Sequence, residues 1–255
     1  MNICLCQYNI EWENKQKNKE KITKILSDIR NVQLIIFPEM ALSGFSFNKK
    51  ATTLTPDDIN FFASIAKSKN AFVCSGGVIE EKNSCLIINP SGDVVMAVAK
   101  IHLFSPSGEP SHHLPGSEIK SFTIGKVRVT PFICYDLRFS PLFWLSAAKT
   151  DIYVVIANWP STRANHWKTL LVARAIENQT FVIGVNRIGI SPKEQYCGDS
   201  CIVDPWGNMV FDACCEEGAF KCKIDASKVE QTRSRFPILN DRKRFAEYEK
   251  LLENE

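Results

Sequence analysis

The sequence has no hydrophobic run long enough to cross a membrane and no separate block of basic residues. A membrane-spanning helix needs roughly 18 apolar residues in succession, and no run in the 255 residues reaches that length. The first residues, MNICLCQYNIEWENK, become charged too early for a signal peptide. The chain has 31 basic and 28 acidic residues, a net charge of only +3, which gives no footprint for nucleic acid. We therefore expect a cytoplasmic protein that binds neither membranes nor nucleic acids.

Motifs for metal binding are also missing. The ten cysteines form no CxxC pair, and there is no HExxH motif, so the spacings that usually mark a zinc site are absent and we expect no metal. In a reducing compartment, cysteines remain free thiols and do not form a disulfide framework. Cys4 and Cys6 alternate with apolar neighbours, which puts both on one face of a predicted strand, where they would pack as small hydrophobic side chains.

The chain contains no linker-like stretch, no low-complexity segment and no sequence repeat. Its length and its 45% hydrophobic content fit one large domain. We expect a single domain over residues 1–255, in which residues 226–255 form a charged C-terminal extension.

The hydrophobic pattern predicts helices alternating with buried strands and hairpins. Apolar runs predict strands at 2–8, 32–37, 71–79, 151–158 and 180–186. Helical periodicity predicts helices at 13–30, 55–70, 139–149 and about 163–178. Turn residues between paired apolar runs predict hairpins at 84–100, 121–136 and 200–213. This order indicates an α/β protein with layers of helices on mixed β-sheets.

Three different reactive side chains follow directly after apolar strands. Glu39 follows LIIFP, Lys100 follows VVMAVA, and Cys134 follows VTPFI. Taken alone, a charge after a strand usually marks the return to solvent, and a cysteine beside Phe-Ile usually belongs to the core. Together they form a chemical set, because Glu39 can take the thiol proton while Lys100 stabilises the thiolate and a developing oxyanion. The backbone N–H of Tyr135 is a second candidate donor to that oxyanion.

The segments around these residues resemble a known family. LIIFPEMALSGFSF, AKIHLF and FICYDLRF are similar to the Glu, Lys and Cys signatures of the nitrilase superfamily, the carbon–nitrogen hydrolases. Their order and spacing also match, and the likeness continues through NWPSTRANHW, LLVARAIENQTFVIGVNR and GDSCIVDPWG, so it covers nearly the whole chain. The resemblance implies a four-layer αββα sandwich, commonly a homodimer, with no cofactor.

Within the superfamily, the Cys-Tyr-Asp form resembles the amidases rather than the true nitrilases, and the closest likeness is to ω-amidases. These enzymes hydrolyse the side-chain amide of 2-oxoglutaramate or 2-oxosuccinamate and release ammonia. By the family pattern, Cys134 attacks the amide carbon, Glu39 is its general base, and a water activated by Glu39 hydrolyses the resulting thioester. Lys100 supports the charged intermediate. The alternatives are another small-amide or N-carbamoyl hydrolase, acyl transfer to an amine, and a non-catalytic interaction protein.

A second glutamate follows the lysine in many members of the superfamily, and Glu109 in the segment GEP stands in that place. The resemblance implies that Glu109 orients Lys100 or the attacking water. The alternative is a solvated carboxylate in a turn-rich loop, where charged residues are common.

Three further residues are candidates for substrate binding. Planar arginine binds carboxylates with two hydrogen bonds, so Arg138, which follows the nucleophile closely, is the candidate for a distal carboxylate of the substrate. Its alternative is a structural ion pair with Asp136 or another buried acid. Asn158 and Trp159 would line the pocket with Tyr135 and Arg138 in the family pattern, and their alternative is ordinary packing at the end of a strand.

Overall fold

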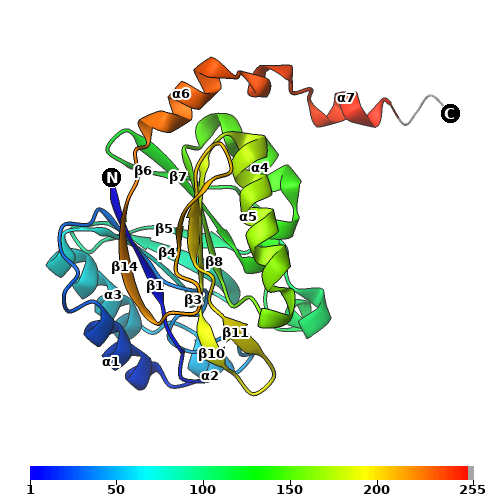
Figure 1. Ribbon diagram of the computed structural model, residues 1–255. Coiled ribbons are helices and arrows are strands. Elements are labelled where there is room, and N and C mark those ends of the chain that lie inside the picture. Colours follow the sequence, from blue (N-terminus) through cyan, green and yellow to red (C-terminus); the bar gives the residue numbers. More distant parts are fainter. Residues whose placement is uncertain (252–255) are drawn as a thin grey trace.

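The computed structural model describes residues 1–251, which form two large sheets that pack face to face between two layers of helices (Figure 1). The strands of the first sheet run in the order β14-β1-β2-β3-β4-β5. β1, β2 and β3 are parallel to one another, and the other strands pair antiparallel. The bounds are β1 (Asn2–Gln7), β2 (Leu34–Ile36), β3 (Phe72–Ile79), β4 (Lys82–Ile88), β5 (Val94–Ala99) and β14 (Gly218–Lys223).

The second sheet repeats this plan, with strands in the order β13-β12-β9-β8-β7-β6 and a parallel centre of β7, β8 and β9. Its other pairs are antiparallel. A separate hairpin is formed by β10 (Ile188–Ile190) and β11 (Gln195–Cys197). The bounds in the second sheet are β6 (Phe122–Ile124), β7 (Val127–Ile133), β8 (Ile152–Ala157), β9 (Phe181–Asn186), β12 (Cys201–Val203) and β13 (Met209–Asp212).

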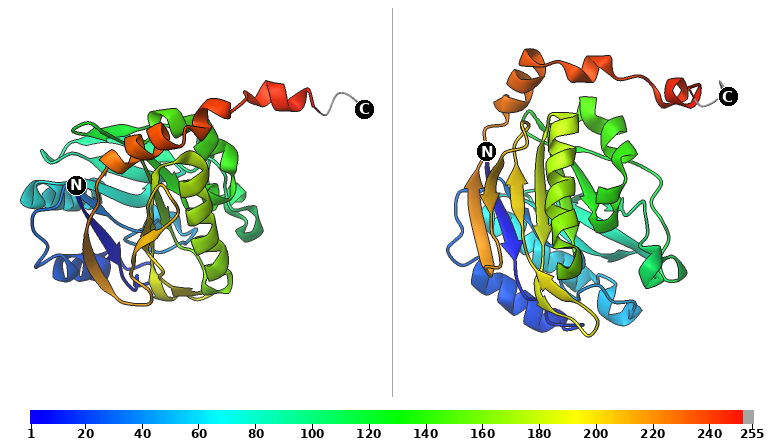
Figure 2. Two further views of the ribbon diagram at one scale, coloured as in Figure 1. Left: turned by 45° about the horizontal axis from the view of Figure 1, so that its top comes forward. Right: turned by 45° about the vertical axis from the view of Figure 1, so that its right-hand side comes forward.

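Helices cover the outer face of each sheet, which completes the four-layer αββα sandwich expected from the resemblance (Figures 1 and 2). α1 and α3 lie on the first sheet, and α4 and α5 lie on the second. The bounds of the helices are α1 (Lys15–Ile25), α2 (Lys49–Thr52), α3 (Pro56–Lys69), α4 (Ser140–Ser146), α5 (Ala164–Asn178), α6 (Ser227–Arg235) and α7 (Phe245–Glu249).

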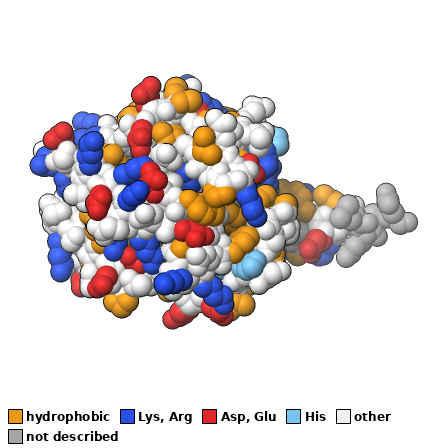
Figure 3. All heavy atoms as spheres, turned by 90° about the horizontal axis from the view of Figure 1, so that it is seen from below, with side chains coloured by type: hydrophobic (Ala, Val, Ile, Leu, Met, Phe, Trp, Pro, Cys, Tyr) orange, Lys and Arg blue, Asp and Glu red, His pale blue; other side chains and the backbone are white. Residues whose placement is uncertain are grey.

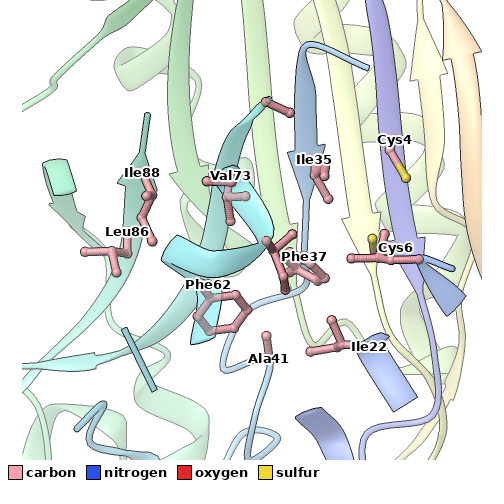
Figure 4. Close-up of a cluster of buried hydrophobic side chains, with 14 of the residues drawn as sticks. Cys4, Cys6, Ile22, Ile35, Phe37, Ala41, Phe62, Val73, Leu86 and Ile88 are labelled. Carbon is pink, nitrogen blue, oxygen red and sulfur yellow. The ribbon is translucent and has the colours of Figure 1, made fainter. Parts of the chain in front are cut away.

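The alternation of side chains along β1 divides the hydrophobic core. Ile3 and Leu5 point between the two sheets, where they join the core made by both. Cys4 and Cys6 point the other way, toward α1, and pack in the outer core with Ile22 (Figure 4). The prediction that these two cysteines are buried small hydrophobic side chains is confirmed, and all ten cysteines are free thiols.

Local signals fix the helix ends. α3 begins with a capping box, in which the side chains of Thr55 and Asp58 each accept a backbone N–H of the other residue. Pro56 occupies the first helical position, and Asn70 ends the helix in the left-handed conformation. The predicted helix at 13–30 is shorter, because Asn14 caps its start and the chain leaves the helix after Ile25.

The other predicted helices and strands are present with ends moved by a few residues, but six elements were not predicted. These are the short helix α2, the two strands of the β10–β11 hairpin, the edge strand β14, and the helices α6 and α7 within the expected charged extension. β14 pairs along its whole length with β1, from Asn2 opposite Lys223 to Gln7 opposite Gly218. Its residues are only half-buried or exposed, so it lacks the apolar run by which the other strands were recognised.

The C-terminal segment from α6 onward extends along and away from the sandwich (Figures 1 and 2). Its first part is fastened to the body: Arg233 donates hydrogen bonds to the carbonyl oxygens of Ala147 and Thr150, and the Arg242 guanidinium stacks 3.9 Å from the Trp144 ring. Residues 252–255 of the expected extension lie outside the described residues. Among residues 1–251, no helix is long and apolar enough to cross a membrane.

Candidate active site

The three side chains that follow apolar strands in the sequence come together at one end of the sandwich. Glu39 follows β2, Lys100 follows β5, and Cys134 follows β7, so the first sheet supplies two of them and the second sheet supplies the third. All three line a cavity of about 610 Å³, a volume within the range of small-molecule sites.

Glu39 is completely buried and held by several donors. Its Oε1 accepts hydrogen bonds from Asn83 Nδ2 at 2.7 Å and from Lys100 Nζ at 3.1 Å. Its Oε2 accepts the backbone N–H of Asn158 at 2.8 Å, and its carbonyl oxygen accepts the Asn158 side-chain amide at 2.5 Å. The carboxylate of Glu39 therefore has a fixed orientation toward the cavity.

Glu109 forms the other side of the buried charge cluster. Lys100 Nζ donates to its Oε2 at 2.9 Å, as does the backbone N–H of Phe104 at 2.6 Å. Since Glu109 is completely buried, its interpretation as a solvated loop carboxylate is wrong. Glu109 does not line the cavity, and its contact with the site is the hydrogen bond from Lys100.

Burial opposes the charge of Lys100, but the charges of Glu39, Cys134 and Glu109 outweigh this effect and hold the pKa of Lys100 above its ordinary value. Lys100 therefore stays protonated at neutral pH. The Phe45 ring, 5.2 Å from Nζ, covers the cation. A fixed buried cation beside the thiol is suited to stabilise negative charge that develops there.

Cys134 occupies a strained backbone position at the start of the 3-10 turn Cys134–Arg138. Its φ angle of 48° lies in the left-handed region, which is unfavourable for residues other than glycine. Asp136 holds the turn, since its carboxylate accepts the backbone N–H groups of Ile133 at 3.2 Å and of His102 at 2.7 Å. The same carboxylate therefore ties the turn that begins at Cys134 to the loop that follows Lys100.

Burial, followed by the negative charge of Glu39, raises the pKa of the Cys134 thiol well above its ordinary value, although Lys100 lowers it. The resting thiol is therefore protonated at neutral pH. Attack on a substrate then needs a base that removes the proton during the reaction, and the carboxylate of Glu39 is the adjacent candidate.

The four predicted substrate-binding residues, Tyr135, Arg138, Asn158 and Trp159, all line the cavity. The Arg138 guanidinium lies 4.8 Å from the Trp159 ring. Within residues 1–251 it makes no ion pair, so its interpretation as a partner of Asp136 is wrong. The carboxylate of Asp136 accepts backbone N–H groups and lies 3.2 Å from His102 Nδ1. Arg138 Nη2 lies instead 3.2 Å from His166 Nδ1.

Asn158 and Trp159 line the cavity and also contact other residues of the protein. The two interpretations of these residues, pocket lining and packing at the end of a strand, therefore both hold. Asn158 positions Glu39, as described above, and Trp159 packs against the Trp167 ring at 5.4 Å. Among residues 1–251, no group of three or more His, Cys, Asp or Glu side chains could hold a metal ion.

Sequence reasoning missed Asn83, whose side-chain amide contacts both Glu39 and Glu109. The signal for it was weak: a polar residue near the start of the apolar strand β4, in the segment KNSCLII. A fully buried asparagine needs hydrogen-bond partners, but nothing in the segment indicates which partners these are.

The chain is similar to known proteins over nearly its whole length. The sequence profile described as carbon–nitrogen hydrolase matches residues 2–234. The chain is 32% identical over 255 residues to the ω-amidase YafV of Yersinia enterocolitica, covering 96% of this chain and 98% of that protein. It is 32% identical over 256 residues to the 2-oxoglutaramate amidase of Paenarthrobacter nicotinovorans, covering 92% of this chain and 87% of that protein.

A solved structure extends the likeness to three dimensions. XC1258 from Xanthomonas campestris is a CN-hydrolase superfamily protein whose crystal structure contains an arsenic adduct in the active site. It superimposes with a TM-score of 0.90 at 31% sequence identity, covering 96% of this chain and 98% of that one.

Proposed function

Because this chain belongs to the carbon–nitrogen hydrolase family, we propose that it is a cysteine-dependent ω-amidase. It would hydrolyse the terminal amide of 2-oxoglutaramate or 2-oxosuccinamate to the carboxylate and ammonia. The observation that supports this most strongly is the meeting of Glu39, Lys100 and Cys134 in one cavity with Arg138, which makes no ion pair within residues 1–251. Relatives named ω-amidase and 2-oxoglutaramate amidase, similar over nearly the full chain, support the choice of substrate.

In the first half of the proposed reaction, the Glu39 carboxylate takes the thiol proton while Cys134 Sγ forms a bond to the amide carbon. The carbonyl π electrons move to oxygen, and the Lys100 ammonium and the backbone N–H of Tyr135 stabilise this oxyanion. Glu39 then gives its proton to the amide nitrogen, the carbon–nitrogen bond breaks, and ammonia leaves a thioester on Cys134.

In the second half, Glu39 takes a proton from water, whose oxygen attacks the thioester carbon. Collapse of this second tetrahedral intermediate breaks the carbon–sulfur bond, and Glu39 returns the proton to sulfur. Glu109 remains a positioning residue, because its hydrogen bond holds Lys100 Nζ between the two carboxylates. One base thus serves both halves of the cycle.

Arg138 is the proposed partner of the substrate's distal carboxylate. It lines the same cavity as the thiol, and one Nη lies 3.2 Å from His166 Nδ1. Its other N–H groups have no hydrogen-bond partner within residues 1–251, so they can donate to a ligand. Hydrogen bonds to charged groups contribute about 1.5–3 kcal/mol. Arg138→Gln should therefore lower kcat/KM for 2-oxoglutaramate roughly 10- to 150-fold, mainly through KM.

A simple aliphatic amide without a carboxylate provides the matched comparison. Its turnover should be nearly unchanged by Arg138→Gln, because it makes no contact with the guanidinium. Equal losses for both substrates would show that Arg138 supports the structure and does not recognise the carboxylate.

The function is tested by ammonia release from purified, reduced enzyme with 2-oxoglutaramate, 2-oxosuccinamate, glutamine, asparagine, simple aliphatic amides and N-carbamoyl compounds. The proposal predicts that the two oxo-amides have the highest kcat/KM. Preference for an N-carbamoyl compound or another amide would establish the alternative hydrolase. Two results together would favour a non-catalytic interaction protein. The folded enzyme would turn over none of these compounds, and an electrophile would label all its cysteines evenly.

We further propose a cytoplasmic homodimer that uses no cofactor and binds neither nucleic acid nor membrane. Large apolar side chains are exposed on the outer helices and the C-terminal segment, among them Leu145, Ile176 and Phe236, and exposed apolar surface of this kind often marks an interface. Basic and acidic side chains are interspersed on the face seen in Figure 3, with hydrophobic side chains gathered beside them. Light scattering should give twice the mass of one chain, and a monomeric mass would contradict the dimer.

A further inference from the structure

Asn83 contacts every charged member of the buried cluster. Its Nδ2 carries two N–H groups and donates to Glu39 Oε1 at 2.7 Å and to Glu109 Oε1 at 2.9 Å. Its backbone carbonyl oxygen accepts the backbone N–H of Lys100 at 2.8 Å. The residue is completely buried in β4, so water does not compete for these contacts.

The orientation of this amide leaves a buried group without a partner. Asn83 Oδ1 has no hydrogen bond within the described part of the chain. Turning the amide over would satisfy neither neighbour, because Oδ1 would then face two carboxylates. A buried amide oxygen without a partner lowers the stability of the fold. The amide orientation therefore provides hydrogen bonds to the two carboxylates but costs folding stability.

The charges in the cluster explain what the amide contributes. Two carboxylates share one ammonium, that of Lys100, and two carboxylates in one buried site tend to keep one proton between them. Hydrogen bonds donated to the charged form of a carboxylate favour that form. The amide of Asn83 is a neutral donor to both carboxylates at once, which stabilises the doubly ionised pair.

We propose that Asn83 is a positioning residue that keeps Glu39 and Glu109 ionised together around Lys100, so that Glu39 is ready to act as a base. The inference rests on the proposed function only for the role of Glu39, and its effect on protonation can be measured without substrate. The other titratable groups that face the pair are the Cys134 thiol, the buried His113 ring and the Tyr196 hydroxyl.

The test compares Asn83→Leu with wild type and with Asn178→Leu. Leucine has a similar size to asparagine and donates no hydrogen bond. Asn178 is a matched control, since it is also completely buried and its Nδ2 also donates two hydrogen bonds, to the Arg174 carbonyl and to Glu177 Oε1, in α5 outside the cavity. Asn83→Ser is the second variant, because a hydroxyl can donate only one hydrogen bond.

Infrared titration of the substrate-free proteins measures the carbonyl band of protonated carboxyl groups. In Asn83→Leu this band should persist to a higher pH than in wild type, with Asn83→Ser between them and Asn178→Leu unchanged. The acid limb of the pH profile of kcat/KM should move to higher pH in the same order of variants. In Asn83→Leu, kcat should fall at least about tenfold near neutral pH while KM stays nearly constant.

Two results would overturn the inference. One is an infrared titration of Asn83→Leu and Asn83→Ser that coincides with that of wild type. The other is a uniform loss of activity in Asn83→Leu that matches Asn178→Leu, with the same pH profile as wild type. Since the infrared result needs no turnover, it separates failure of this inference from failure of the proposed amidase activity.

Discussion

Gly76 controls the position of Glu39 through direct contact between β3 and the turn that follows β2. It lies in β3, next to β2, where a Cβ would meet only backbone: Met40 N at 2.5 Å, Glu39 Cα at 2.6 Å and Glu39 C at 2.9 Å. Ordinary contact begins at 3.4 Å. In Gly76→Ala, the backbone at 39–40 must therefore retreat by about 0.9 Å, because backbone cannot rotate away as a flexible side chain can.

A shift of this size breaks the hydrogen bonds of the Glu39 carboxylate, which has donors at 2.7–3.1 Å. A misplacement of about 1 Å in a catalytic group can reduce the rate roughly 100-fold, and overpacking costs about 1–3 kcal/mol of stability. We therefore expect kcat/KM of Gly76→Ala to fall roughly 100-fold and its melting temperature to fall by several degrees.

The assay is ammonia release from 2-oxoglutaramate, with thermal unfolding followed by circular dichroism. Gly218→Ala is the control, since a Cβ there meets no atom closer than 3.5 Å, and it should keep wild-type activity. Wild-type kcat/KM in Gly76→Ala would refute the reasoning. A lower melting temperature with unchanged kcat/KM would mean that the contact supports the fold but not the base.

Two other predictions concern pH. Burial and then the charge of Glu39 raise the pKa of the Cys134 thiol. Glu39→Gln should therefore lower that pKa and speed alkylation of the thiol by iodoacetamide at a given pH, yet abolish ammonia release. Retained turnover would contradict the role of Glu39 as the base. Burial alone would raise the pKa of Asp58, but two lysines of α1 and the Thr55 cap lower it to about 2. Asp58→Asn should therefore lose about 2 kcal/mol of stability at neutral pH, and urea denaturation should show this difference shrinking as pH falls from about 4 toward 2; a constant difference would be evidence against the ion pairs.

The three reactive residues could be predicted from the sequence because each ends a clearly apolar run. The rule that sites form at strand ends made Glu39, Lys100 and Cys134 candidates, although they belong to two different sheets. Local pattern alone does not reveal that these sheets face each other with these ends together. The resemblance to a family supplied that step, and the fold agrees with it.

Other features depend on contacts that no local pattern reveals. Asn83 lies opposite Val78 in the pairing of β4 with β3, and it reaches Glu109 only because the loop after Lys100 folds back over it. Its place in the sequence makes Asp136 a candidate ion-pair partner of Arg138, but the 3-10 turn directs its carboxylate to backbone N–H groups. Edge strand β14 depends in the same way on its partner β1 at the other end of the chain.

The central claim is that Cys134 carries the acyl group of the amide as a thioester. Rapid acid quenching during turnover of 2-oxoglutaramate, followed by mass spectrometry, tests it directly. The account predicts a 2-oxoglutaryl adduct on the peptide that contains Cys134, lost on treatment with hydroxylamine, and neither adduct nor ammonia release in Cys134→Ala. Ammonia release by Cys134→Ala, or an adduct confined to another cysteine, would contradict the account.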